Sequence, residues 1–492
     1  MTMTVDSILI QLSEIVWGPV MVCLLVGTGL YLTIQLRFVQ FRHFGHAIRC
    51  ISGKYDHLED AGDISHFQAL ATALSATIGT GNIAGVATAI AMGGPGAVFW
   101  MWITALVGMA TKFTSCSLAL HFRNIHEDGS ASGGPMYFLE KGFHPKLLVR
   151  LAGESLTRKI ALILAISFAL FTIIVSFGTG NMVQANSVVN GLKYILPTAW
   201  QQSEICFYID KINLSLSVNY FSLIIGVTLA ILVGLVILGG IRRIAAVTAR
   251  LVPFMCVIYI LGSVAVLILH LDRIPKCLTM IFRYAFTPYA VGGGIVGATV
   301  SQALRFGVAR GVFSNESGLG SAPMAHAAAK THEMAREGFV AMLGPFIDTI
   351  IICSMTALVI LVTDAHSSGF TSSSLTAKAF DVGLFGYGQY IVGFGLIFFA
   401  YSTTISWSYY GDRCAEYLFG PRAVFWYRCI YVVFIVVGAI GGLRIIWNLA
   451  DIFNALMAIP NLIGLVALVS LVTAKKRNYL KRLKAGEFDK LQ

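Results

Sequence analysis

A short run of small and polar residues interrupts an otherwise apolar segment near the start of the chain. The segment covers 75–102, and the interruption is Gly79-Thr80-Gly81-Asn82. Glycine costs a helix interior about 1 kcal/mol relative to alanine, and asparagine is also a weak helix former. In hydrocarbon, the backbone groups that a break frees must find partners in protein or in a wet cavity. The pattern therefore predicts a broken membrane helix with a binding site at the break.

The two ends of the predicted break suit opposite charges. Thr80, Gly81 and Asn82 begin the second half-helix, where free backbone amides and the helix dipole favour an anion such as a carboxylate. The first half-helix ends around Ser75 and Ile78 with unpaired carbonyl oxygens, which are ligands for a hard cation such as Na⁺. We expect a carboxylate and a cation to fit side by side here.

Polar residues on a later apolar segment supply a candidate partner surface. Asn181, Gln184 and Asn186 lie in the segment 160–190, which is otherwise apolar. Amide side chains in a membrane helix need partners, so these three residues are candidates to face the break.

A second candidate surface lies in AYSTTISWSYYG. Ser402, Thr403 and Thr404 come one turn before Trp407, and the Thr403 and Thr404 hydroxyls with the Ala400 carbonyl could complete a cation shell. The alternative is that these hydroxyls bond carbonyls of their own helix. The sequence leaves both readings open.

Ionisable residues within membrane segments are functional candidates by default. Asp348 is the clearest, and we add Thr77 and Glu316 as candidates for an ion or gating role. Lys112 is near the predicted end of its segment, where its ammonium group can reach the surface. Asp451 could serve either a structural hydrogen bond or an ion.

The stretch 305–330 is unusual for a connection between membrane segments. It is rich in glycine and alanine, and it carries Arg305, Arg310 and Glu316 among apolar residues. It could form a gate under the site or a packed structural loop, and the sequence favours neither.

The elements that must position these residues are membrane helices. The chain has 492 residues, of which 57% are hydrophobic and 12% charged, whereas soluble domains carry about 25% charged residues. We predict an all-α polytopic membrane protein. Its apolar segments of about 20 residues number eleven, at 13–36, 67–92, 96–120, 160–190, 217–239, 246–271, 284–306, 338–363, 386–410, 424–443 and 446–473.

The basic residues predict the orientation. Of the 35 Lys and Arg, 27 fall in alternate connections and the C-terminal tail. The positive-inside rule then places the N-terminus outside and the C-terminus in the cytoplasm, in the cytoplasmic (inner) membrane. We therefore attribute the net charge of +11 to basic residues that set the orientation in the membrane and contact anionic lipid of the bilayer. It does not indicate a nucleic-acid surface. The nine scattered cysteines predict free thiols.

A second glycine cluster suggests an internal repeat. Gly292, Gly293, Gly294 and Gly297 lie in the seventh segment, five segments after the first break. Two five-helix halves, each opening with a broken helix, enter the membrane in opposite directions and form an inverted repeat. The alternative for either cluster is close helix packing. The predicted units are 1–66, an extra helix and connection; the halves 67–271 and 272–473; and the basic tail 474–492.

Long stretches of the chain resemble the alanine or glycine:cation symporter family, also called the sodium:alanine symporters. The matching segments are 79–102, 132–142, 180–190, 307–331, 348–360 and 447–465. The resemblance implies a LeuT-like fold of five plus five helices preceded by one extra helix. It also implies Na⁺-driven uptake of small neutral amino acids, chiefly alanine and glycine, with Na⁺ as coupling ion and no organic cofactor.

The resemblance also implies roles for particular residues. Thr80, Gly81 and Asn82 would face the substrate carboxylate. Gln184 and Trp407 would line the pocket. One sodium site would be formed by Ser75, Ile78, Ala400, Thr403 and Thr404.

Two positions depart from the family pattern. Ser115 in GMATKFTSCS stands where the family usually has an acidic residue, which puts the choice of coupling ion in question. Gly294 stands where an aromatic residue is typical, and the loss of a ring would enlarge the pocket.

The sequence thus favours a secondary active transporter that takes up a small neutral amino acid with Na⁺. The alternative in the same class is a proton-coupled or exchange transporter for a somewhat larger neutral amino acid. An enzyme is disfavoured because the metalloprotease, nucleophile-elbow and phosphate-loop motifs are missing from the sequence. A channel is disfavoured because there is no selectivity-filter or charged-ring pattern. Nothing in the sequence indicates an oligomeric state.

The Gly294 departure gives a testable prediction. Restoring a ring with Gly294→Phe should narrow the substrate range toward glycine and alanine, because the ring would fill space in the pocket. The substrate range is measured by how strongly each unlabelled neutral amino acid inhibits the uptake of labelled alanine. A range identical to that of the unsubstituted protein would mean that residue 294 does not border the site.

Overall fold

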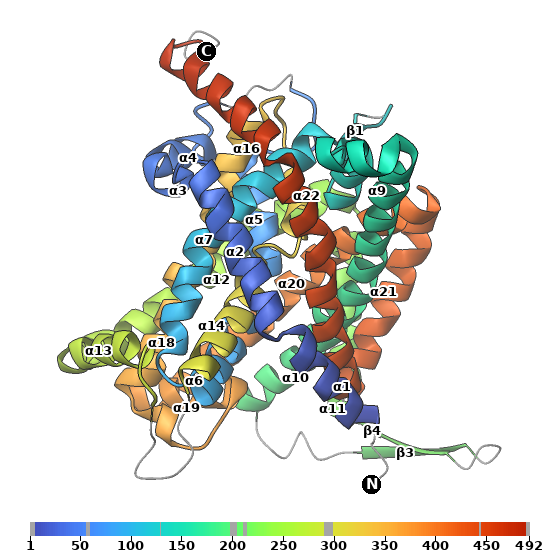
Figure 1. The fold of residues 1–492 in the computed structure, drawn as a ribbon. Coiled ribbons are helices and arrows are strands. Elements are labelled where there is room, and N and C mark those ends of the chain that lie inside the picture. The colour runs from blue at the N-terminus through green and yellow to red at the C-terminus, as the bar shows by residue number, and fades with distance from the viewer. Residues whose placement is uncertain are drawn as a thin grey trace.

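The computed structural model describes residues 5–55, 60–127, 129–196, 204–209, 214–289, 299–441 and 444–488. These residues form a bundle of helices that run between the end of the molecule where the C-terminus lies and the opposite end, near the N-terminus (Figure 1). Within the described ranges, nine helices are long and apolar enough to span a membrane, and one bent pair makes a tenth. The predicted all-α membrane class is confirmed, whereas the predicted count of eleven is not.

Most of the spans are single long helices. In the part of the chain that the structure describes, six helices qualify by themselves, namely α7 (Ala97–His121), α11 (Tyr220–Ile237), α12 (Gly240–Leu269), α20 (Gly388–Phe419), α21 (Ala423–Ile440) and α22 (Arg444–Lys484).

The remaining spans are composite. One joins α1 (Val5–Val16) and α2 (Pro19–Gln35), a second joins α9 (Lys146–Phe177), η2 (Gly178–Met182) and α10 (Val183–Ile195), and a third joins α16 (Met334–Ala341), α17 (Leu343–Pro345), η6 (Phe346–Cys353) and α18 (Ser354–Val362). The bent pair consists of α5 (His66–Thr77) followed by η1 (Gly81–Gly85) and α6 (Val86–Gly93), with a bend of 52°. The predicted break in this helix is confirmed.

Shorter elements connect the spans. They are α3 (Val39–Arg42), α4 (Phe44–Ile51), α8 (Pro135–Gly142), η5 (Leu271–Arg273), α13 (Ile274–Tyr284), α14 (Val300–Asn315), α15 (Ala322–His326), η7 (Ala365–Ser367) and α19 (Ser372–Gly383). Two antiparallel hairpins complete the described elements. In one, β1 (Asn124–Ile125) pairs with β2 (Ala131–Ser132), and in the other, β3 (Glu204–Ile209) pairs with β4 (Leu214–Asn219) so that Glu204 lies opposite Asn219.

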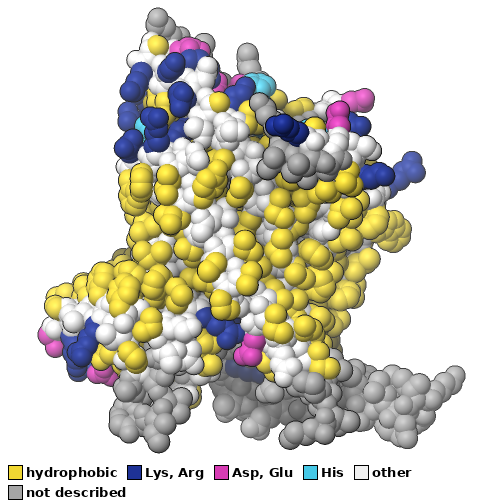
Figure 2. Space-filling model, viewed as in Figure 1, with side chains coloured by type: hydrophobic (Ala, Val, Ile, Leu, Met, Phe, Trp, Pro, Cys, Tyr) yellow, Lys and Arg dark blue, Asp and Glu magenta, His cyan; other side chains and the backbone are white. Residues whose placement is uncertain are grey.

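Burial separates central from peripheral helices. In the most apolar stretch of α7, 83% of the residues are buried, against 28% in α21. On the face drawn in Figure 2, the apolar side chains that remain exposed form a broad belt, and charged side chains gather beyond it. An exposed apolar surface this large marks a membrane interface. The central position of α7 and α20 means that their polar residues face protein.

The seventh predicted segment differs most from the structure. Residues 290–298, which include the second glycine cluster and Gly294, lie outside the described residues. Beyond them, α14 continues to Asn315, nine residues past the predicted end of the segment, so Arg305 and Arg310 lie on a helix and not in a connection. The two guanidinium groups are tolerated there because acidic partners from other helices lie 3.9 Å away, Glu14 for Arg305 and Asp451 for Arg310.

Candidate functional site

The break after α5 is held open by the asparagine that follows it. The Gly79 backbone N–H donates to Asn82 Oδ1 at 2.9 Å, and the Asn82 N–H donates to the Gly79 carbonyl at 3.3 Å. The Asn82 side chain thus replaces a backbone partner that a continuous helix would have supplied. This is the condition under which irregular backbone persists inside a membrane protein.

The carbonyls after the break also find partners on other helices. The Thr356 hydroxyl donates to the Asn82 carbonyl at 2.8 Å, and the Thr376 hydroxyl donates to the Ile83 carbonyl at 2.8 Å. Because Thr356 is on α18 and Thr376 on α19, the unwound turn is fixed from two sides.

Asp348 anchors this arrangement from η6. The Asn82 amide donates to Asp348 Oδ1 at 2.7 Å, and the hydroxyls of Ser314 and Thr349 each donate to Asp348 Oδ2 at 2.8 Å. All four residues are buried. Both carboxylate oxygens are therefore engaged, and Asp348 serves to position the break.

The first half-helix meets α20 through oxygen atoms. The Ser75 hydroxyl donates to the Ser402 carbonyl at 2.8 Å, and the Thr403 hydroxyl donates to the Ser75 carbonyl at 3.0 Å. Thr404 instead donates to the Ala400 carbonyl of its own helix at 2.9 Å. The family resemblance implied one sodium site formed by Ser75, Ile78, Ala400, Thr403 and Thr404. The structure brings Ser75 and Thr403 into contact, with the Thr404–Ala400 pair on the adjoining turn of α20.

Gln184 reaches the break from α10. Its Nε2 donates to the Thr80 hydroxyl at 3.3 Å and to the Thr179 carbonyl at 3.0 Å. Its Oε1 is buried and has no hydrogen-bond partner among the described residues. A Cβ atom added to Gly79 would lie 3.8 Å from this oxygen, so the unpaired acceptor stands beside the break. Buried polar atoms are nearly always paired, so this oxygen has the capacity to accept a further hydrogen bond.

A small pocket lies where these elements meet. Its volume is about 10 Å³, room for about one water-sized sphere. Seven residues singled out from the sequence line it, namely Thr77, Thr80, Gly81, Gln184, Glu316, Thr403 and Trp407. Five further lining residues are Ala76, Gly79, Thr179, Phe313 and Asn454.

The other predicted site residues lie outside this lining. Ser75, Ile78, Ala400 and Thr404 are buried next to it on α5 and α20. Asn82 and Asp348 face each other behind the break, and the Asn82 side chain points to the anchor and not to the pocket. Gly294 lies outside the described residues.

A sequence signal for Thr179 existed. The tetrapeptide Gly-Thr-Gly-Asn occurs at 79–82 and again at 178–181. Each copy overlaps a π-helical segment, η1 and η2 respectively, and the threonine of each copy lines the pocket. Such π-helical turns are frequent at functional sites. By contrast, no local pattern indicated Phe313 or Asn454, which reach the pocket from α14 and α22.

The pocket is closed toward the N-terminal end of the molecule. One turn before Phe313, the Arg310 guanidinium lies 3.9 Å from the Asp451 carboxylate, which is one turn before Asn454. Trp17 adds an indole N–H that donates to the Asp451 carbonyl at 3.0 Å. This cluster joins α14, α22 and the residue that follows α1, on the side of the pocket nearer the N-terminal end of the molecule.

Contacts at the opposite end tie the start of α5 to the stretch 316–333. Glu337 bridges two buried histidines, accepting from His66 at the start of α5 and pairing with His326 at 2.5 Å. Arg123 donates four hydrogen bonds to backbone carbonyls on both sides, those of Ala61, Ala327, Ala329 and Thr331, at 2.7 to 2.8 Å. Residues 316–331, which make up most of the glycine-rich stretch, are thus a packed and mostly buried segment on the side of the pocket opposite the Arg310–Asp451 contact.

Comparison with known proteins extends over the whole chain. The model of the sodium:alanine symporter family matches residues 1–492. The sodium/alanine symporter AgcS of Methanococcus maripaludis is 44% identical over 477 residues, which are 96% of this chain and 97% of the relative. The probable sodium/glutamine symporter GlnT of Bacillus subtilis is 31% identical over 481 residues, which are 96% of this chain and 91% of the relative.

A solved structure shares the architecture at much lower identity. The manganese transporter of Eremococcus coleocola superposes with a TM-score of 0.51 over 88% of this chain and 92% of that chain, at 13% identity. This likeness concerns the LeuT-like fold alone.

The contact between the break and α20 yields a stability prediction. A Cβ on Gly79 would lie 2.7 Å from Thr403 Oγ1, whereas nothing lies within 4 Å of a Cβ on Gly85. Gly79→Ala should destabilise the protein by about 1–3 kcal/mol through overpacking. The matched change Gly85→Ala should be neutral or stabilising by up to about 1 kcal/mol. Denaturant unfolding in detergent measures both, and equal stabilities of the two variants would contradict this packing.

Proposed function

We propose a function from the premise that this chain belongs to the sodium:alanine symporter family. The proposed activity is uptake of a small neutral amino acid, coupled to inward movement of Na⁺. The family is one of transporters, so the expected activity is transport and not catalysis. AgcS, the relative at 44% identity, is a sodium/alanine symporter by its name, which supports alanine as the substrate.

One observation carries the proposal. Thr80 and Gly81, at the start of the second half-helix, line the pocket, and Thr403 lines it from α20 with its hydroxyl bonded to the Ser75 carbonyl just outside the lining. An amino acid carries a carboxylate for the first, and Na⁺ is a hard cation for the second. Substrate and ion would therefore bind at neighbouring sites, which is the geometry that coupling needs.

The donor set fits Na⁺ as the co-transported ion. The Ser75 carbonyl, the Thr403 and Thr404 hydroxyls and the Ala400 carbonyl are neutral oxygen atoms, two pairs of which lie 3.0 and 2.9 Å apart. In the proposed assignment the Ile78 carbonyl completes the set at the end of α5. Neutral oxygen ligands of this kind suit a hard cation.

Gln184 is proposed to orient the substrate. Its unpaired Oε1 would accept a hydrogen bond from the substrate ammonium group, while its Nε2 is held by Thr80 and Thr179. Trp407 closes the same pocket over the side-chain end. An indole wall on the pocket favours a short side chain.

Transport requires the pocket walls to move, because a cavity of about 10 Å³ has room for about one water and not for an amino acid. We propose that the Arg310–Asp451 contact opens on the N-terminal, outer side, and that the base of α5 opens on the basic, cytoplasmic side. The proposed moving units are the inverted halves 67–271 and 272–473. The N-terminus lies outside and the C-terminus inside, as the positive-inside rule predicts.

A second candidate is a somewhat larger neutral amino acid. GlnT is a probable sodium/glutamine symporter by its name, and Gly294 departs from the aromatic residue expected of the family. The two substrates are distinguished by uptake of labelled alanine and glutamine under the same Na⁺ gradient.

The ion site gives the first functional prediction. Replacing Thr403 and Thr404 together by alanine should raise the Na⁺ concentration for half-maximal uptake about tenfold or more, because two oxygen ligands are lost. Ser408→Ala is the matched control. Ser408 is buried on the same helix and donates to the Ile405 carbonyl of that helix at 2.7 Å. An unchanged Na⁺ dependence in the double variant would remove these residues from the ion site.

The proposed substrate site gives the second functional prediction. Gln184→Ala should raise the KM for the amino acid about tenfold or more, since a hydrogen bond to a charged group contributes about 1.5–3 kcal/mol. Asn186→Ala serves as control, because Asn186 accepts from Asn190 on the same helix and does not line the pocket. Initial uptake rates at saturating Na⁺ measure both. Equal KM values for the two variants would place Gln184 outside the substrate site.

A further inference from the structure

A cluster of positive charge lies far from the transport pocket, at the end of the bundle where the C-terminus lies (Figure 2). There α22 passes over the turn between α2 and α3. Together they enclose a cavity of about 280 Å³ that we call the basic pocket. Its six cationic residues are Arg37, Arg42, Lys476, Arg477, Lys481 and Lys484.

The basic pocket has no built-in counter-charge. None of its lining residues is acidic. In the ranges that the structure describes, none of its six cationic side chains takes part in an ion pair. Elsewhere at the same end of the molecule, Arg482 pairs with Glu333 at 2.7 Å. Like charges repel, so this cluster costs stability unless an anion binds.

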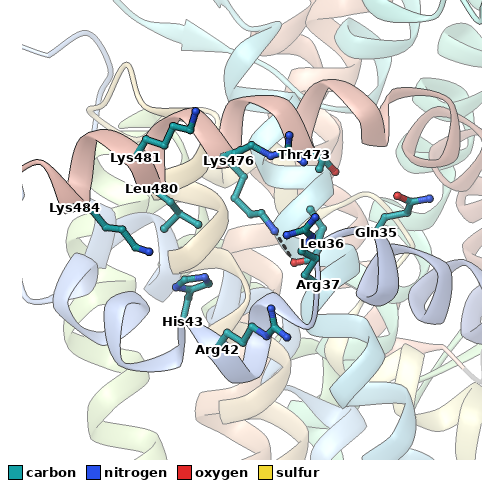
Figure 3. A pocket seen from close by; sticks show the side chains of 11 residues that line it. Gln35, Leu36, Arg37, Arg42, His43, Thr473, Lys476, Leu480, Lys481 and Lys484 are labelled. Carbon is teal, nitrogen blue, oxygen red and sulfur yellow. Dashed lines mark hydrogen bonds between the residues drawn. The ribbon is translucent and has the colours of Figure 1, made fainter.

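The floor of the pocket is rigid. Lys476 is buried, and its Nζ donates to the Leu36 carbonyl at the end of α2 at 2.5 Å (Figure 3). The next two residues, Arg37 and Phe38, have left-handed backbones with φ of 56° and 57°. Such conformations cost non-glycine residues about 1–2 kcal/mol each, and strain of this kind clusters at ligand clamps. The turn fixes Arg37 beside the pocket.

The side chains around the opening remain free to bind. Figure 3 shows Lys484 and Lys476 reaching from α22 toward the segment that carries Arg42 and His43. Burial first, and then the positive charges of Lys476, Arg42 and Lys484, lower the pKa of His43. The charges of the pocket thus add to the effect of burial on this imidazole.

The position of the pocket selects among anions. A helix of 41 residues such as α22 is about 60 Å long, twice the hydrocarbon thickness of about 30 Å, so its last turns pass beyond the apolar belt. Beside the pocket, Phe38 and Phe41 are exposed by 46% and 60%. Exposed aromatic rings next to Lys and Arg are typical of the headgroup level of a membrane.

We infer that the basic pocket binds the headgroup phosphate of an anionic phospholipid, with the acyl chains against Phe38 and Phe41. Arginine and lysine are the residues that bind phosphate groups, and basic pockets between membrane helices on the cytoplasmic side bind anionic headgroups. A free phosphate would use the same cations but would gain nothing from the exposed phenylalanine rings.

The test compares two triple variants of the full-length protein in detergent. The pocket variant is R42Q/K481Q/K484Q, which leaves the buried Lys476 in place. The control variant, R49Q/R158Q/K475Q, removes three exposed charges from other places at the same end of the molecule. Native mass spectrometry with dioleoylphosphatidylglycerol measures binding. This readout is independent of uptake, so the inference can fail while the proposed function stands, and the reverse.

We expect the control variant to bind phosphatidylglycerol as the unsubstituted protein does, and the pocket variant to bind it on the order of a hundredfold more weakly. Equal binding by the two variants would overturn the inference. Inorganic phosphate should not displace the lipid at equal concentration, and displacement would overturn the assignment to a lipid. If the triple pocket variant does not fold, the single change K484Q tests the same point. We then expect a smaller loss of affinity for phosphatidylglycerol, and an unchanged affinity would contradict the inference.

Discussion

The hydrogen bonds between Asn82 and Asp348 are the constraint on which the transport site depends. A membrane helix can unwind only where its freed backbone groups find protein partners. Here the Asn82 side chain accepts from the Gly79 amide and donates to the Asp348 carboxylate. The carboxylate in turn collects hydroxyls from Ser314 on α14 and Thr349 on η6. One buried carboxylate thus fixes the break relative to η6 and α14.

The geometry of the pocket follows from that anchor. Because Asn82 turns toward Asp348, Thr80 and Gly81 are left to face the pocket, opposite Gln184 and Trp407. The same break brings the Ser75 carbonyl to the Thr403 hydroxyl of α20. On the N-terminal side of the pocket, the Arg310–Asp451 contact joins α14 to α22, and toward the opposite end Glu337 joins α16 to the start of α5 and to α15. In the proposed assignment the substrate and the ion bind at the two ends of one break, so the binding of one would favour the binding of the other, as symport requires.

Much of this was predictable, because a broken apolar segment has a clear composition. The glycines and Asn82 predicted the break, and the structure has it between Thr77 and Gly81. The sequence could not predict which side of the break each side chain faces, because Asn82 finds its partner 266 residues later in the chain. It also ended the seventh segment too early, since the charges of Arg305 and Arg310 are balanced by residues on distant helices. The basic pocket arises only from tertiary packing, where the tail of α22 crosses the α2–α3 turn.

Uptake of labelled alanine by the purified protein in proteoliposomes tests the central claim, that amino acid and Na⁺ cross together through this site. With Na⁺ outside and K⁺ inside, alanine should accumulate above its external concentration, and a Na⁺ ionophore should abolish the accumulation. Uptake that is undiminished when choline replaces Na⁺, but collapses with the pH gradient, would contradict the account and favour a proton-coupled transporter.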